Sequence, residues 1–287
     1  MILNRRAAIL WATGAAFSGM ALPRAASVAA PRGFDPGDPT DNLYGLAKVM
    51  GDLNGEPNWM IGEGRIYALV HGEMPVPLFG VSGLRYVKFV REGDGFRMSV
   101  RDWGFFTDLD TGAVLESYRN PYTGETNTPA PLLTRLSSWI MSPGGQHVEG
   151  YSGEAWLMDR PLLLPWSFSG EDAAVTLELL VKYGHGGYGA EWINMLARTS
   201  DVIDAAVTRA DMRYSWGGYS PWARWMNMGD RPGRTFWNST GRKAANLDSL
   251  APKVRAIYDR YFPGSLGNPE TYEKTSGLTT TSDQEAY

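Results

Sequence analysis

From residue 61 onward, apolar and polar positions alternate with a period of two, which is the pattern of β-strands. The segments RIYALVHG, LRYVKFVREGDGFRMSVRDWGFF and AVLESYRNPYTG follow this alternation. Glycine-bearing turns at 93–95 and 110–112 separate them as hairpin turns do. The alternation returns in RPLLLPWSFSG, AAVTLELLVKYG, DMRYSWGGYSPWARWMNMG and GRTFWNST. The pattern therefore predicts about seven or eight short strands.

Other segments show helical spacing. DNLYGLAKVMGDL predicts a helix from residue 41, with Asp41 as its N-cap. PLLTRLSSWIM and AEWINMLARTSDVIDAAVTRA predict further helices at residues 131–141 and 190–210. SLAPKVRAIYDRYF predicts a last helix, with Pro252 in its first turn.

The order of these elements predicts the fold class. Strands do not alternate with helices as they do in parallel α/β sheets, and hairpin turns favour antiparallel pairing. We therefore expect a mainly β fold, an antiparallel, closed or nearly closed, calycin-like barrel with inserted helices and a C-terminal helix. This single domain is expected at residues 41–262, after a linker at 30–40 and before a disordered tail at 263–287.

Residues 1–29 have the features of an export signal. Arg5 and Arg6 precede the apolar run AAILWATGAAFSGMAL, which is too short for a stable membrane anchor. The small residues that end at Ala29 fit a signal-peptidase site, and the paired arginines resemble a twin-arginine signal. Neighbouring residues depart from that pattern, so Sec export stays open. We expect a periplasmic or secreted protein without a stable membrane anchor after signal removal.

Composition excludes several classes of function. A formal net charge of -4 gives no basic field for nucleic acid. With no cysteine, thiol catalysis, zinc–thiolate sites and iron–sulfur clusters are excluded. Nucleophile-elbow, His-Glu-x-x-His and phosphate-loop motifs are missing, and GHGGYG lacks nucleotide-loop spacing. A metal site would need His71, His147 and His185 to converge, so we expect neither a metal nor a cofactor.

Two motifs carry a family resemblance. They are RNPYTGE, at 119–125, and WARWMNMGDRPGRTFWNSTGRK, at 222–243. With the Pro-bearing helix that follows, they resemble exported bacterial proteins grouped as domain of unknown function 1838, over about residues 41–272. The resemblance implies a bacterial exported single domain and brings no catalytic assignment.

Strand phase selects candidate catalytic residues, because polar residues on the apolar phase of a strand face inward. Four such residues are Asp102, His185, Tyr214 and Arg224. Asp102 and His185 are a candidate acid/base pair, Tyr214 is a third catalytic candidate, and Arg224 suits an anionic group. Each also has a structural interpretation, as an ion-pair partner, a loop-entry residue or a core tyrosine.

The candidate ligand-binding residues are mainly aromatic. They are Tyr67, Trp103, Tyr118, Trp216, Trp222 and Met226, together with Arg119 and Arg224. RNPYTGE is typical of a tight turn shaped by Asn120, Pro121 and Gly124. Alternatively, Arg119, Tyr122 and Glu125 line the rim of a pocket.

These features predict an exported protein that binds a hydrophobic small molecule in an apolar pocket with a few polar groups. We expect a cofactor-independent, non-redox enzyme, an isomerase, cyclase, lyase or hydrolase acting on an aromatic or polycyclic substrate. One alternative is a non-catalytic periplasmic carrier of a lipid-like ligand, which needs neither Asp102 nor His185. Another is a glycan-binding module, which requires its aromatic side chains on an exposed face. The oligomeric state is left open.

Overall fold

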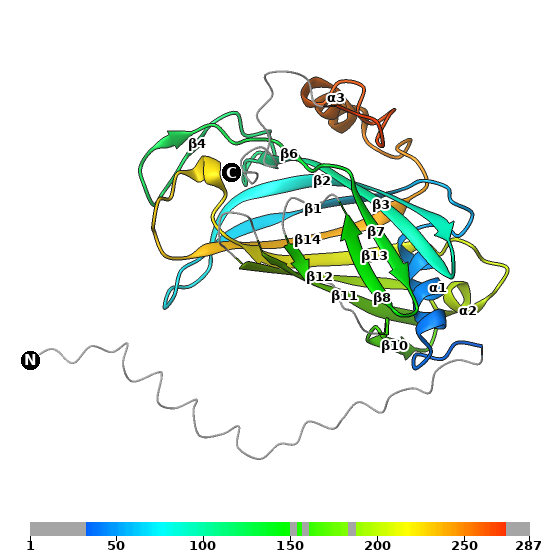
Figure 1. Cartoon of the computed structure of the whole chain (residues 1–287). Helices are drawn as coiled ribbons and strands as arrows, with labels where there is room; N and C mark the ends of the chain where they lie inside the picture. The colour runs from blue at the N-terminus through cyan, green and yellow to red at the C-terminus, as the bar shows by residue number, and fades with distance from the viewer. Residues whose placement is uncertain (1–32, 150–153, 157–160, 183–187, 274–287) are drawn as a thin grey trace, which may run out of the picture.

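The computed structural model describes residues 33–149, 154–156, 161–182 and 188–273 (Figure 1). The helical segments of this part are α1 (Pro39–Met50), α2 (Thr199–Ile203), the 3-10 turn η1 (Arg224–Met226) and α3 (Pro252–Tyr261). None of the helices described is long and apolar enough to cross a membrane.

Strands outnumber helices in the described residues. The strands are β1 (Asn58–Leu69), β2 (Val76–Glu92), β3 (Gly95–Thr107), β4 (Tyr118–Arg119), β5 (Thr126–Asn127), β6 (Leu132–Leu133), β7 (Ser137–Ser142), β8 (Gly145–Glu149), β9 (Glu154–Trp156), β10 (Trp166–Ser169), β11 (Asp172–Lys182), β12 (Tyr188–Arg198), β13 (Met212–Ser220) and β14 (Arg234–Ala244). Strands β4 and β5 form a small hairpin, and the others form one 12-stranded sheet. All described pairings are antiparallel, which confirms the mainly β, antiparallel prediction.

The large sheet has the strand order β10-β11-β12-β13-β14-β1-β2-β3-β7-β8, with β6 on β3 and β9 on β11. It curls strongly, so that β7 and β8 come to lie over β11 and β12 in the view of Figure 1. No described ladder joins β8 to β10, so the hydrogen-bonded path does not close into a barrel. The closed form of the expected barrel is therefore not found in the described residues.

Helix α1 fills one end of the curled sheet. Leu43, Leu46 and Met50 are fully buried there, in a core that also contains side chains of β3, β7, β11, β12 and β13. Two buried lysines fix the helix by their ammonium groups. Lys243 Nζ, from β14, donates to the carbonyl oxygens of Lys48 (2.8 Å) and Gly51 (2.9 Å) at the C-terminal end of α1. Lys48 Nζ donates to two carbonyls of the α2 region at 3.0 and 2.7 Å.

The η1 segment covers the other end. Trp225 packs against Phe79 and Phe106, with ring centroids 5.2 and 5.3 Å apart. Buried Asn120 donates from Nδ2 to the carbonyl oxygen of Met226 at 2.7 Å. The two family motifs therefore meet at this end of the sheet, and the RNPYTGE segment is the tight turn that its sequence predicts.

Helix α3 and the segment after it cover the outer face of β1, β2 and β3 (Figure 1). Arg101 donates from Nη1 to the carbonyl oxygens of Pro269 and Tyr272, both at 2.9 Å. Glu270 accepts from Tyr86 and, at 3.0 Å, from Lys88. Residues 263–273 of the expected disordered tail therefore pack on the sheet, and residues 274–287 lie outside the described residues. Part of the expected linker at residues 30–40 also packs on the domain, since Phe34 is buried against Trp166.

Three segments differ in type from the sequence-based expectation. Residues 131–141 form β6 and β7, and residues 190–198 form β12, where helices were expected. Along β12, buried Ile193, Met195 and Ala197 alternate with exposed residues, so one face of the strand is apolar. Residues 224–226 form η1 where a strand was expected. Neighbouring strands supply the hydrogen bonds of β7 and β12, and pairing of this kind overrides local propensity.

Candidate functional site

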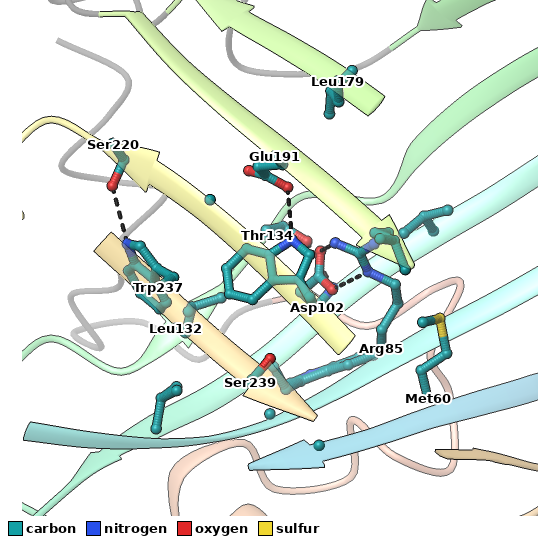
Figure 2. A pocket seen from close by; sticks show the side chains of 18 of the residues that line it. Met60, Arg85, Asp102, Leu132, Thr134, Leu179, Glu191, Ser220, Trp237 and Ser239 are labelled. Atoms are coloured by element: carbon teal, nitrogen blue, oxygen red, sulfur yellow. Dashed lines mark hydrogen bonds and ion pairs between the residues drawn. The ribbon is translucent and has the colours of Figure 1, made fainter. Parts of the chain in front are cut away.

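A cavity of about 260 Å³ lies on the inner face of the curled sheet, between α1 and η1 (Figure 2). Its wall is mainly apolar and comes from strands on both sides of the curl. The apolar lining side chains include those of Met50, Met60, Val81, Met98, Val100, Phe106, Trp139, Leu177, Leu179, Ile193, Trp216, Trp222 and Trp237. Arg135 and Arg224 are the exposed lining residues and therefore mark the mouth.

Glycines on the inner face make room for the cavity and for Tyr214. A Cβ atom at Gly62 would lie 2.3 Å from the Tyr214 hydroxyl, and one at Gly241 would lie 2.6 Å from it. The phenol therefore occupies the space that two side chains would take. At Gly83, by contrast, a Cβ atom would lie 3.7 Å from the nearest atom, a carbonyl oxygen, so this wall position is open.

An ion pair crosses the inner face between β2 and β3. Arg85 Nε donates to Asp102 Oδ1 at 2.6 Å, and Nη2 lies 3.4 Å from Oδ2 (Figure 2). The two residues are direct cross-strand partners, and both side chains, 24% and 23% exposed, line the cavity. Burial lowers the pKa of Arg85, but Asp102, Glu191 and Tyr214 outweigh it and raise this pKa above its ordinary value. The guanidinium stays charged.

Glu191 of β12 is the second carboxylate of the cavity. Its Oε2 accepts a hydrogen bond from Trp216 Nε1 at 3.2 Å. Burial raises the pKa of Glu191, and the charge of Asp102 raises it further, although Arg85 and the Trp216 bond act in the opposite direction. A carboxyl group with a raised pKa exchanges protons more readily near neutral pH, as general acid or base catalysis requires.

Tyr214 lies near the same charges and is suited to hydrogen bonding in its neutral form. Burial raises its pKa to about 12, with Asp102 adding to this effect and Arg85 opposing it. Nearer the mouth, Trp237 Nε1 donates to Ser220 Oγ at 3.1 Å, and Trp222 Nε1 donates to the carbonyl oxygen of Arg231 at 3.1 Å. The indoles of Trp216, Trp222 and Trp237 are thus fixed by hydrogen bonds at their edges.

The structure brings part of the sequence-predicted set together. Six candidates line the cavity: Asp102, Trp103, Tyr214, Trp216, Trp222 and Arg224. Trp103 does so with its ring turned to the α3 side, 5.6 Å from the ring of Trp59. Arg224 lines the cavity from η1 and not from the expected strand.

Four other candidates are not among the lining residues. Tyr118 and Met226 are part of the cluster around Trp225 that covers this end of the sheet. Arg119 is exposed on β4. Tyr67 lies on the outer face of β1, with its ring 6.1 Å from that of Phe236. His185 lies outside the described residues, so its pairing with Asp102 stays a prediction.

Two residues of the polar cluster were not predicted from the sequence. Arg85 stands on the inward phase of β2 between Gly83 and Val87, where strand phase alone selects it. Glu191 continues the buried phase of β12, but this segment has a helix-like composition that conceals the period of two. Among the described residues, no group of three or more histidine or acidic side chains is placed to hold a metal ion.

Comparisons with known proteins give a family and no named relative. A family model described as "Protein of unknown function (DUF1838)" matches residues 55–139 and 177–283. No curated protein matches the sequence. Among solved structures, an N-terminal dehydratase from the difficidin assembly line aligns at 10% identity, over 77% of this chain and 86% of that one. Its TM-score of 0.11 carries no argument about fold.

Proposed function

The chain belongs to the DUF1838 family, and we propose that it binds a hydrophobic small molecule in the cavity and transforms it by acid/base chemistry. The observation that carries this proposal is one polar cluster, Arg85, Asp102 and Glu191, in an otherwise mainly apolar wall. Apolar enclosure supplies affinity, at about 25 cal/mol for each Å² of apolar surface removed from water. The few polar groups orient the ligand.

In this proposal Glu191 is the proton-transferring group. Its raised pKa lets it hold a proton to a higher pH than an ordinary glutamate and donate it to a ligand at the polar cluster. Asp102, which is paired with Arg85, is placed to stabilise positive charge that develops nearby. Tyr214 stays neutral and offers its hydroxyl as a donor to an oxygen of the ligand. A non-redox isomerisation, cyclisation, elimination or hydrolysis is compatible with these groups.

The turnover part of the proposal has a direct test. The ligand retained by protein from the native source is identified by native mass spectrometry and incubated with fresh enzyme in D₂O. Wild-type protein should change the mass of the ligand or exchange protons of the ligand for deuterons. Glu191→Gln and Asp102→Asn should lower the rate about 100-fold or more while binding persists, and Glu178→Gln, on the exposed outer face of β11, should match wild type. An unchanged ligand in every sample would contradict the proposed enzyme function and would support the alternative of a non-catalytic carrier.

We further propose that the curled sheet functions as a calycin-like barrel around its ligand, and that the protein works after export to the periplasm or outside the cell. The paired arginines Arg5 and Arg6 support the export proposal. Arg5→Lys with Arg6→Lys should leave the full-length chain in the cytoplasm when cell fractions are compared by immunoblot. A full-length wild-type protein in the cytoplasm would contradict export.

One observation favours glycan binding as a second candidate function. Tyr67 of β1, Phe236 of β14 and Trp192 of β12 are half-buried on the outer face of the sheet. The ring centroid of Phe236 lies 6.1 Å from that of Tyr67 and 6.3 Å from that of Trp192. Aromatic side chains on an exposed face suit stacking on sugar rings. Retention of the protein in a polysaccharide affinity gel, lost in Trp192→Ala, would support this function. If wild type and the Trp192→Ala variant migrate at the same rate in the polysaccharide gel, glycan binding at this face is contradicted.

A further inference from the structure

The charges in the cavity do not balance at the polar cluster. Arg85 and Asp102 are paired at 2.6 Å, so their charges largely cancel. Glu191, when ionised, adds a second negative charge, and its described hydrogen bond comes from the neutral indole of Trp216. With Glu191 ionised, the half-buried wall of the cavity therefore carries a net negative charge where a ligand would place its polar group.

The positive charges at the mouth do not reverse this balance. Arg135 and Arg224 line the cavity but are exposed, whereas Glu191 is half-buried on β12 between Leu179 of β11 and Gly218 of β13. Exposed charges interact through water and are screened by salt, so they act on a ligand much less than partly buried charges do. The charge of an ionised Glu191, which the Arg85–Asp102 pair does not compensate, thus dominates the field inside.

A ligand responds to this field according to its own polar group. A carboxylate placed here would meet Glu191 and Asp102 as like charges, with only the already paired Arg85 to oppose them. An ammonium would form a charge-assisted hydrogen bond with Glu191. The aromatic lining around it, with Trp216 and Trp237, adds surfaces that attract cations.

We infer that the cavity selects hydrophobic molecules whose polar group is an ammonium, held by Glu191, over molecules of the same shape that carry a carboxylate. A neutral hydroxyl, which can donate one hydrogen bond to Glu191, takes an intermediate place. This inference rests on the proposed function and specifies the class of ligand that the cavity accepts.

Three probes of one shape test the inference: 2-naphthylmethylamine, 2-naphthalenemethanol and 2-naphthoate, titrated into the full chain by calorimetry at pH 8. In wild type the amine should bind about tenfold or more tightly than the alcohol, and the carboxylate should bind most weakly. Glu191→Gln should remove the preference for the amine over the alcohol, because a neutral amide does not pair with an ammonium. Glu178→Gln, a matched change on the outer face, should keep the wild-type order.

Each outcome decides the inference. Carboxylate binding as tight as amine binding would overturn it, as would an amine preference that survives in Glu191→Gln. In both cases the alcohol still binds, so the proposed cavity function stands and only the ligand class falls. If none of the probes binds wild type, the inference and the proposed function fall together. As a control, melting curves should show that Glu191→Gln and Glu178→Gln are folded.

Discussion

At the scale of single residues, the Arg85–Asp102 pair is the feature on which the cavity depends. Both side chains are about three-quarters buried, so each charge has lost part of its hydration and is compensated by the other. Asp102 is further fixed through its backbone N–H, which donates to Thr134 Oγ1 at 2.8 Å. Removing the arginine would leave Asp102 and Glu191 as two carboxylates in one apolar space.

We predict that Arg85→Met lowers the free energy of unfolding at pH 7 by about 2 kcal/mol. This loss lies between those caused by breaking an exposed ion pair and by breaking a fully buried one. Arg85→Met combined with Asp102→Met should regain most of this loss, because no unpaired charge remains. Arg260→Met, at the exposed pair with Glu116, is the control and should cost less than about 0.5 kcal/mol. Urea denaturation measures all three, and equal effects of Arg85→Met and Arg260→Met would refute the prediction.

Single residues also show what strand phase does and does not reveal. Asp102 and Tyr214 stand on the apolar phase of clearly alternating strands and line the cavity, as expected. Arg224 lines it for a different reason, because its segment forms a 3-10 turn. Glu191 escaped prediction because its strand has the composition of a helix. Strand phase finds a site residue only when the strand itself is recognised.

At the scale of elements, α1 is held in place by an unusual buried cation. Lys243 is 5% exposed, and its Nζ lies at the C-terminal end of the helix, bonded to two carbonyl oxygens. Burial and, to a smaller extent, the charge of Arg209 lower the pKa of Lys243 from 10.5 to about 7, although Asp211 and Asp52 oppose this shift. The amine thus loses its proton in the folded protein at a pH at which the unfolded chain still keeps it.

This difference makes stability depend on pH. Between about pH 7 and 10.5 the unfolded state binds more protons at Lys243 than the folded state does, so the free energy of unfolding rises with pH. The slope from this group is at most about 1.4 kcal/mol per pH unit. Lys243→Met should remove this rise, so the wild-type minus variant difference should increase from pH 7 to 10. A difference that falls or stays constant in denaturant titrations would contradict the assignment.

Elements also show why local patterns misassign some segments. Residues 131–141 and 190–198 are rich in helix-compatible residues, yet they pair as strands with β3, β8, β11 and β13. Their partners lie elsewhere in the chain, so no window of local sequence contains the hydrogen bonds that decide their conformation. The hairpin at 93–95 was predictable because its turn and both its strands are neighbours in sequence.

At the scale of the whole molecule, residues of the curled sheet, of α1 and of η1 together line the cavity. Figure 1 shows how the sheet curls. The antiparallel β class followed from alternation and turns. The curl and the two end segments did not, because they depend on packing between distant parts, such as Asn120 with Met226. The proposed function depends on the cavity being a ligand site.

Titration of 2-naphthalenemethanol into wild type, Gly83→Ala and Gly83→Phe tests this claim most directly. Gly83 lines the cavity and accepts a Cβ atom without a clash, so a phenyl ring at this position would fill the space without straining the strand. The alcohol should bind wild type and Gly83→Ala with one site per chain. It should bind Gly83→Phe at least about tenfold more weakly, with the fold unchanged by circular dichroism. Equal binding to all three, or no binding to wild type, would contradict the account.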